Sequence, residues 1–130
     1  MTRRVLGPDH SETLDDMDGL DMVYLKQQNF VAAETLSREY LTILERNSPD
    51  SWRRHYGQVL LGASLAGQQR YAEAEPLLVS GYQRMMQRKA AIPLTFRGRV
   101  PWAEERIVQL YQSWGKPEKA AEWQAKLQMK

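Results

Sequence analysis

Residues 60–78 read LLGASLAGQQRYAEAEPLL, and this stretch decides the fold. Leu61 and Leu65 lie about one helical turn apart on an apolar stripe, and the glycine and alanines between them keep one side of the helix thin. A polar turn begins at Gly67, a residue type that tolerates the left-handed geometry of a helix end. The apolar pattern restarts around Ala74. The stretch therefore predicts two antiparallel helices joined by a short turn, with small side chains where they touch.

The same hairpin pattern occurs three times along the chain. The matching positions are Leu20, Leu61 and Ile107 in the first helices, and Phe30, Tyr71 and Pro117 at the starts of the second helices, each followed three residues later by Ala33, Ala74 or Ala120. The spacings are 41 residues (74 − 33) and 46 residues (120 − 74), with the excess in an irregular loop over residues 90–100. A period in this range predicts a helical solenoid, in which no single hairpin can bury its own apolar face.

We therefore expect an all-α fold: one domain over residues 1–130, made of three helical hairpins with about six helices. The expected repeats cover about residues 11–47, 50–90 and 101–128. A chain of 130 residues is long enough to bury a core. Its lack of cysteine excludes disulfides and thiolate metal sites.

The charge and hydropathy of the chain narrow the class of protein further. Residues 1–50 carry a net charge of −5 and residues 51–130 a net charge of +7, which together make the overall +2. The first residues lack the apolar core of a signal peptide. The longest apolar run is far shorter than the roughly 20 residues of a membrane-spanning helix. We expect a soluble, cytoplasmic protein that does not bind a membrane.

The three hairpins resemble tetratricopeptide repeats, in the longer variety found in kinesin light chain. The pattern of small and large residues in that family matches Leu61, Gly62, Leu65, Ala74 and Leu78, and part of it recurs at Tyr24 with Ala33 and at Tyr111 with Ala120. Residues 5–14 look like the linker between such repeats. Residues 60–78 and 114–127 look like the C-terminal repeat tail of large bacterial serine/threonine kinases, although the chain carries no kinase signature.

The resemblance implies a right-handed superhelix whose first helices line a concave groove that binds a peptide or partner protein. It also implies that the chain is a non-catalytic bacterial scaffold and a piece of a larger, kinase-linked repeat array. Carried over residue by residue, the family's groove positions are Asp15, Asp18, Met22, Leu25 and Lys26 in repeat one, Tyr56, Val59, Ala63 and Ala66 in repeat two, and Trp102, Glu105, Gln109 and Gln112 in repeat three. This groove would have an acidic rim, an apolar middle and a polar far end, and would suit a basic residue of the ligand near repeat one.

Repeat one departs from the family at Asp21, which stands where a small residue is preferred against the partner helix. Asp18 and Gly19 likewise replace a pair of asparagines that usually face the groove. The resemblance therefore predicts looser packing or different binding in repeat one.

We expect no enzymatic activity, metal site or cofactor. The acidic segment from Asp15 to Asp21 resembles a calcium loop only briefly, because Leu14 and Leu25 stand where a ligand and the bidentate glutamate belong. The two histidines, His10 and His55, have no metal-ligand spacing, and we expect surface or capping roles for them.

Two other interpretations stay open. The first is a self-assembly module, a homo-oligomer formed through the uncovered apolar face of repeat one, which upstream repeats could also cover. The second is a nucleic-acid-binding module that uses the basic segment 84–99, in which Arg84, Arg88, Lys89, Arg97 and Arg99 accompany Phe96 without an acidic residue.

Overall fold

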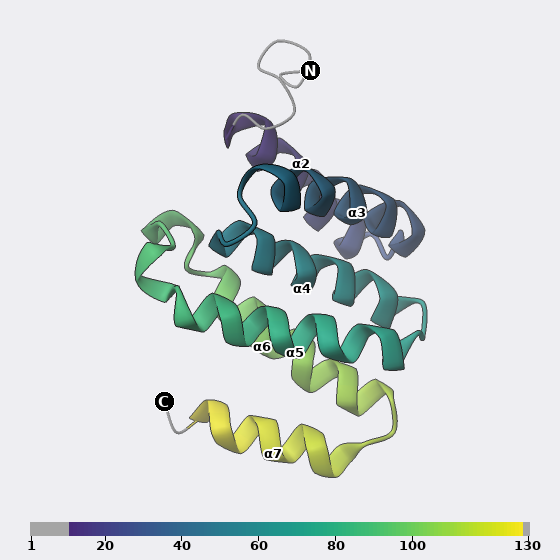
Figure 1. Ribbon diagram of the computed structural model, residues 1–130. Helices are drawn as coiled ribbons and strands as arrows, with labels where there is room; N and C mark the ends of the chain where they lie inside the picture. The colour runs from purple at the N-terminus through teal and green to yellow at the C-terminus, as the bar shows by residue number, and fades with distance from the viewer. Residues whose placement is uncertain (1–10, 129–130) are drawn as a thin grey trace.

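The computed structural model describes residues 11–128, which fold into helices stacked in chain order (Figure 1). The α-helices are α2 (Ser11–Lys26), α3 (Phe30–Asn47), α4 (Trp52–Gly67), α5 (Tyr71–Gln87), α6 (Arg99–Ser113) and α7 (Pro117–Gln128). Consecutive helices pack against each other, and the first helices of successive hairpins, α2 with α4 and α4 with α6, are also in contact. This arrangement confirms the expected all-α, repeat-like solenoid. Residues 5–10 of the expected linker, including His10, lie outside the described residues, and residues 11–14 belong to α2.

The three hairpins turn in the same way. One residue in each turn has a left-handed backbone: Gln28 (φ 59°), Gln69 (φ 65°) and Gly115 (φ 75°). The residue after it donates its amide hydrogen to a carbonyl five residues back, in the pairs Asn29–Tyr24 (2.8 Å), Arg70–Leu65 (3.0 Å) and Lys116–Tyr111 (2.8 Å). The second helices begin at the three expected residues. The repeat in the sequence is therefore also present in the backbone conformation of the three turns.

Gly67 does not take the left-handed position that its place at the turn predicts. It is the last residue of α4, and the left-handed residue is Gln69. A Cβ atom at Gly67 would lie 2.3–2.5 Å from three atoms of the Phe30 ring. This glycine is therefore needed because an aromatic ring from the first hairpin lies against its backbone.

Small residues form the contacts within the hairpins. Ala33 and Ala74 are fully buried and Ala120 is 3% exposed. At Gly62 an added Cβ would lie 2.8 Å from Cγ of Leu78 and 3.2 Å from the carbonyl oxygen of Ala74. The helices of the second hairpin thus approach closely because the residue at the contact has no side chain.

A polar pair replaces this contact in the first hairpin. Asp21 stands 41 residues before Gly62, and Ser37 stands 41 residues before Leu78. Both polar residues are fully buried, and the Ser37 hydroxyl donates to Oδ2 of Asp21 at 2.5 Å. The two helices therefore meet here through one hydrogen bond, and Oδ1 of Asp21 is buried without a hydrogen-bond partner among the described residues.

The segment between α5 and α6, predicted as irregular, contains two short 3₁₀ helices, η1 (Lys89–Ala91) and η2 (Leu94–Phe96). Ile92 between them is 1% exposed and belongs to the core. The side chain of Arg97 donates to the carbonyl oxygen of Ile92 at 3.0 Å. The segment therefore has a defined structure and brings Phe96 against the first helices.

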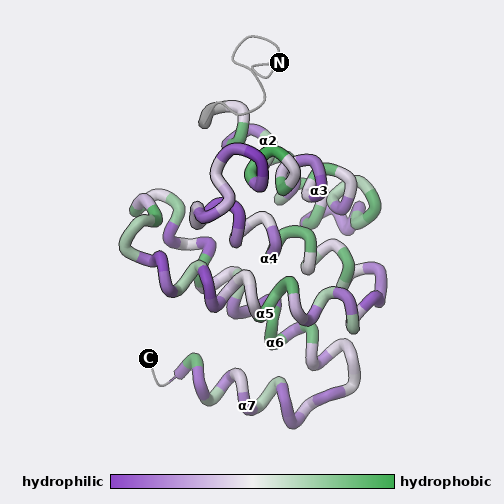
Figure 2. The backbone as a smooth tube through the Cα atoms, viewed as in Figure 1, coloured by the Kyte–Doolittle hydropathy of each residue, from purple (hydrophilic) through white to green (hydrophobic). Residues whose placement is uncertain are grey.

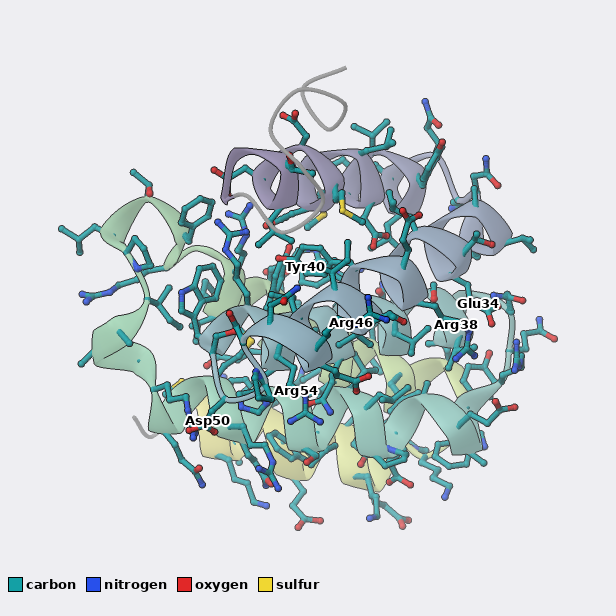
Figure 3. The ribbon with its side chains drawn as sticks, turned by 45° about the horizontal axis from the view of Figure 1, so that its top comes forward. Glu34, Arg38, Tyr40, Arg46, Asp50 and Arg54 are labelled. Carbon is teal, nitrogen blue, oxygen red and sulfur yellow. The ribbon has the colours of Figure 1, made fainter. Side chains whose placement is uncertain are left out.

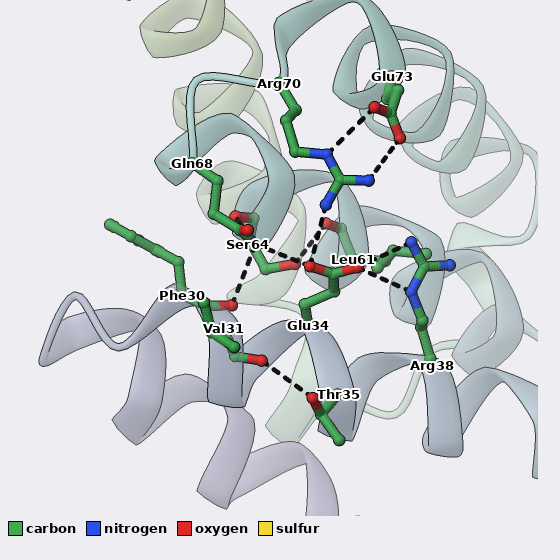
Figure 4. A network of polar contacts seen from close by, with 10 residues as sticks. All are labelled: Phe30, Val31, Glu34, Thr35, Arg38, Leu61, Ser64, Gln68, Arg70 and Glu73. Carbon is green, nitrogen blue, oxygen red and sulfur yellow. Dashed lines mark hydrogen bonds and ion pairs between the residues drawn. The ribbon is translucent and has the colours of Figure 1, made fainter.

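Polar contacts tie the first hairpin to the second. Glu34 of α3 accepts hydrogen bonds from Gln68 (2.9 Å) and Arg70 (3.2 Å), both in the turn between α4 and α5 (Figure 4). The Gln68 bond and the neighbouring arginines hold the pKa of Glu34 below its usual range. Tyr40 points into the interior between the first two hairpins and is 1% exposed (Figure 3). These contacts fix the angle between two repeats and so shape the surface that their first helices share.

Candidate functional site

The first helices share a groove of about 420 Å³. Its walls come from α2 and α6 and its floor from α4, with the turns of the first two hairpins closing one end. The lining residues are Leu25, Lys26, Gln28, Phe30, Ala63, Ala66, Gly67, Gln69, Tyr71, Leu78, Trp102, Arg106, Gln109, Leu110 and Ser113. We call this surface the groove. Three helices that are far apart in the sequence therefore build a single concave site.

The groove is hollow because α4 is thin on this side. Ala63, Ala66 and Gly67 form the floor, whereas large side chains such as Phe30 and Trp102 stand around it. Sites for small molecules and peptide side chains commonly have this size and are mostly apolar with a few polar groups. The groove can thus receive one or two apolar side chains and contact polar groups at their edges.

Arg106 is the most unusual polar residue of the groove. Its guanidinium lies 5.5 Å from the ring centre of Trp102, and its Nη2 is 3.6 Å from the Glu105 carboxylate. Its Nε is buried and has no hydrogen-bond partner among the described residues. Burial lowers the pKa of this guanidinium. The side chain as a whole is half-buried, so only its terminal nitrogens can be reached from outside.

The acidic rim predicted for repeat one is absent, because its two aspartates are bound to arginines. Asp18 is fully buried, and its Oδ1 accepts from Arg99 (3.0 Å) and from the hydroxyl of Tyr56 (3.3 Å). Its Oδ2 lies 3.8 Å from Nη1 of Arg53, whose Nη2 pairs with Asp15. Burial raises the pKa of Asp18, and the two arginines oppose this effect. The cluster joins α2, α4 and α6, with Asp18 in the interior and Asp15 at the surface.

Aromatic rings cover this charged cluster. The guanidinium of Arg99 lies 4.4 Å from the ring centre of Phe96, and that of Arg53 lies 5.2 Å from the same ring. Phe96 also packs on Trp52 with ring centres 5.5 Å apart. The segment between α5 and α6 therefore closes the end of the concave surface that begins at Asp15.

The structure brings six of the thirteen predicted groove residues together in the groove: Leu25, Lys26, Ala63, Ala66, Trp102 and Gln109. It places the other seven differently. Asp18, Tyr56 and Val59 are fully buried, Met22 is half-buried against the core, and Asp15 is exposed and paired with Arg53. Glu105 and Gln112 line a shallow depression between α6 and α7.

Predicted groove residues at matching positions differ in burial because they lie in different repeats of the solenoid. Asp18, Val59 and Glu105 occupy matching places, 41 and 46 residues apart. Asp18 is covered by residues of α4 and α6, and Val59 lies against Gly81 of α5, whereas Glu105 on α6 is exposed. The same repeat position therefore serves packing in the interior of the array and surface chemistry at its end.

The sequence analysis did not predict several of the residues that line the groove. Phe30 and Tyr71 begin the second helices, and their large rings at matching positions were the one signal available. Arg106 matches Leu60 and Gly19 in the other repeats, so the repeat pattern gave no indication of it.

Residues 11–128 contain no group of three or more histidine, cysteine, aspartate or glutamate side chains that could hold a metal ion. His55 is fully buried, with Nδ1 3.4 Å from the amide oxygen of Gln58, so its predicted surface or capping role is wrong. Burial lowers the pKa of its imidazole. No helix within this part of the chain is long and apolar enough to cross a membrane.

Much of the basic segment 84–99 is engaged within the protein. Arg88 pairs with Asp50 and donates to its carbonyl oxygen at 2.8 Å. Arg97 donates to a backbone carbonyl, and Arg99 binds Asp18. Arg84 and Lys89 remain exposed, so the positive surface is smaller than the composition of the segment indicates.

Comparison of the chain with protein-family models gives no match, and comparison with curated proteins gives none either. The resemblance to tetratricopeptide repeats therefore stays a prediction from the sequence.

Proposed function

We propose that the chain is a non-catalytic interaction module, of the tetratricopeptide kind, whose partner inserts a peptide segment into the groove. The observation that carries this proposal is that α2, α4 and α6 together line one cavity of about 420 Å³. Its apolar floor, with polar groups at the edges, suits recognition of side chains from an extended or helical segment. The contacts between the hairpins hold the walls in place before the partner arrives, which lowers the cost of binding.

Filling the groove tests the proposal. Short random peptides displayed on phage are selected on the full chain, and an enriched peptide is labelled with fluorescein for anisotropy titrations. Ala66→Trp places a large side chain on the floor and should weaken binding by at least about tenfold. Ala125→Trp, at an exposed position of α7, is the matched control and should leave affinity unchanged.

Circular dichroism confirms that both variants are folded before the titrations are compared. An enriched peptide that binds Ala66→Trp as tightly as the parent chain would contradict the proposed groove. Failure to enrich any peptide would contradict peptide binding altogether.

Self-assembly is a second candidate function, because apolar side chains of repeat one are exposed. We call the exposed surface around Leu20 and Val23 the edge. Leu20 is 41% exposed, whereas the matching Leu61 and Ile107 are 5% and 0% exposed. Val23 beside it is 46% exposed, and Val31 at the start of α3 is 68% exposed. Hydrophobic residues recur along α2 and α3, whereas α7 is mostly hydrophilic (Figure 2). The candidate occupant of the edge is therefore a second copy of repeat one, paired across a twofold axis.

Light scattering across a dilution series tests this second candidate. Pairing through the edge predicts a dimer whose population falls on dilution and is lost in Leu20→Gln. Leu94→Gln removes a more exposed side chain in η2 and should leave the dimer intact. A single monomeric mass at every concentration would rule self-assembly out.

A further inference from the structure

We propose that the first hairpin has a proton-controlled opening, in which α2 separates from α3 when the buried carboxyl group of Asp21 loses its proton. The second and third hairpins stay folded while this happens. Because α2 is one wall of the groove, the opening also takes the groove apart. The opening itself does not depend on the proposed peptide binding, whereas its effect on a partner does.

Asp21 lies where an ionised carboxylate has little to stabilise it. Its side chain is fully buried at the contact of α2 with α3, where the Ser37 hydroxyl donates to Oδ2 at 2.5 Å. Its Oδ1 is buried without a hydrogen-bond partner among the described residues. A buried charge needs a cation or several donors to offset the loss of water, and one hydroxyl supplies a single hydrogen bond. The closed hairpin therefore favours the neutral acid.

The neighbouring carboxylate favours the neutral acid as well. Asp18 is one helical turn before Asp21 on α2 and is also fully buried. Burial raises the pKa of Asp21 to about 7, and the charge of Asp18 adds to the rise against the effect of the Ser37 bond. In an open hairpin Asp21 would be in water and would hold its proton less tightly, so a rise in pH favours the open form.

The other titratable groups of this region act on Asp18. Arg53 of α4 lies 3.8 Å from its Oδ2, and Arg99 of α6 lies 3.0 Å from its Oδ1. Tyr56 of α4 donates to the same carboxylate at 3.3 Å, and on α3 burial and then the charge of Asp18 raise the pKa of Tyr40. These contacts hold α2 to α4 and α6, so the open form stays a minor state until the neighbouring carboxyl group ionises.

The first hairpin can open alone because it is packed on one side only. A hairpin of a solenoid contacts just its neighbours, and among the described residues the first hairpin has one neighbour, the second hairpin. On its far side Leu20, Val23 and Val31 are 41%, 46% and 68% exposed. The bonds from the second hairpin to Glu34 hold α3 and do not involve α2. Local opening at such an end costs less than global unfolding.

The opening bears on the groove through the residues of α2 that line it. Leu25 and Lys26 both belong to this wall. If a peptide binds in the groove as proposed, its affinity should fall as pH rises through about 7. This consequence rests on the proposed function. The opening is measured without a peptide, so failure of one proposal can be told from failure of the other.

Thiol accessibility measures the opening directly, because the chain contains no cysteine. Ala33→Cys places a thiol on α3 within the first hairpin, and Ala74→Cys places one at the matching, equally buried position of the second. The rate of reaction of each full chain with dithiodipyridine is divided by the rate of an unstructured thiol peptide at the same pH. From about pH 6 to about pH 8.5, the protection of Ala33→Cys should fall about tenfold and that of Ala74→Cys should stay constant.

Two substitutions on α2 assign the opening to Asp21. Asp21→Asn, combined with Ala33→Cys, keeps a partner for Ser37 and should remove the dependence on pH. Asp16→Asn, at an exposed position of α2, is the matched control and should leave the tenfold fall unchanged. If a cysteine variant does not fold, amide hydrogen exchange of the unsubstituted chain at both pH values gives the same test. There α2 and α3 should lose protection as pH rises, and α4 and α5 should keep it.

The outcomes are separable. Equal loss of protection at Ala33→Cys and Ala74→Cys would show global unfolding and overturn the local opening. Protection of Ala33→Cys that is constant with pH, or that still falls in Asp21→Asn, would overturn the role of Asp21. Peptide affinity that does not change with pH, although the opening is observed, would leave the opening intact and contradict the proposed groove.

Discussion

The two helices of the first hairpin and those of the second hairpin meet at matching positions through different chemistry. In the second hairpin Gly62 leaves room for the fully buried Leu78. At the matching positions of the first hairpin, Asp21 and Ser37 meet through a hydrogen bond of 2.5 Å. A carboxylate and a hydroxyl together take the place of one leucine against a glycine. The comparison shows that the helix contact is conserved as a shape while its chemistry changes from apolar to polar.

The polar contact and the apolar contact should differ in how their stability depends on pH. An apolar contact keeps its stabilising effect across the pH range, whereas a buried carboxylate loses stability when it ionises. Burial raises the pKa of Asp21 to about 7, with a further rise from the charge of Asp18 and an opposing effect from the Ser37 bond. At this helix contact, only the first hairpin should therefore have a stability that depends on pH.

Truncating the apolar contact should have the largest effect. Leu78→Ala leaves a cavity against Gly62 in the second hairpin, and we expect it to lower the free energy of unfolding by about 3–5 kcal/mol. Ser37→Ala in the first hairpin removes one hydrogen bond and should cost about 1–2 kcal/mol. Urea denaturation of both variants measures the difference, and equal costs would contradict the assignment of one contact to apolar packing and of the other to a single hydrogen bond.

The pH dependence of the polar contact should be the next largest effect. The folded-state pKa of Asp21, about 7, lies above its unfolded value of about 3.9, so the folded chain binds more protons between these values. The stability that Asp21 contributes is fully present below about pH 4 and is lost as pH rises through 7. Asp21→Asn keeps a partner for Ser37 and should remove this loss, on the order of 4 kcal/mol.

Asp18 acts in the same direction, because burial also raises its pKa. The parent chain and Asp21→Asn are therefore compared at each pH by urea denaturation. The variant should match the parent near pH 4 and exceed it near pH 8. A constant difference across this range would show that Asp21 is not the titrating group.

Two glycines of the first helices give a smaller, paired test. An alanine at Gly62 would press its Cβ against Leu78, so Gly62→Ala should destabilise by about 1–2 kcal/mol. Gly19 in α2 is exposed and no atom lies within 4 Å of an added Cβ, so Gly19→Ala should stabilise by about 0.5–1 kcal/mol. Thermal unfolding followed by circular dichroism should show shifts of opposite sign, and shifts of the same sign would contradict the close contact at Gly62.

The turns provide the smallest expected effect. Gln69 has a left-handed backbone (φ 65°), as Gly115 does in the matching turn (φ 75°). Gln69→Gly should stabilise by about 0.5 kcal/mol, because relief of the backbone strain outweighs the greater freedom of glycine in the unfolded chain. Gly115→Ala should destabilise by about 1 kcal/mol, and a stabilising Gly115→Ala would contradict the shared turn geometry.

The hairpins could be predicted from the sequence because the signals are local and repeated. The starts of the second helices and the buried alanines follow from spacing alone, and Ala63 and Ala66 indicated where the concave side would be hollow. The position of the left-handed residue was missed at Gly67, because there the glycine serves a contact with Phe30 that no local pattern encodes.

The charged residues could not be placed in the same way. Asp18 is buried because Arg53 and Arg99 reach it, and Arg99 is 81 residues away in the sequence. Neither repeat period nor helical spacing records such a pairing. The acidic rim was therefore predicted where the structure pairs both aspartates with arginines, and the place of Arg106 in the groove had no signal in the repeat pattern.

Backbone NMR titration of the chain with a peptide enriched from the random library tests the proposed groove most directly. Our account predicts that the largest amide shifts fall on α4 and α6, at Ala63, Ala66, Trp102 and Gln109, with smaller shifts near Lys26. Shifts confined to the outer helices α3, α5 and α7, or to the exposed edge at Leu20 and Val23, would contradict it.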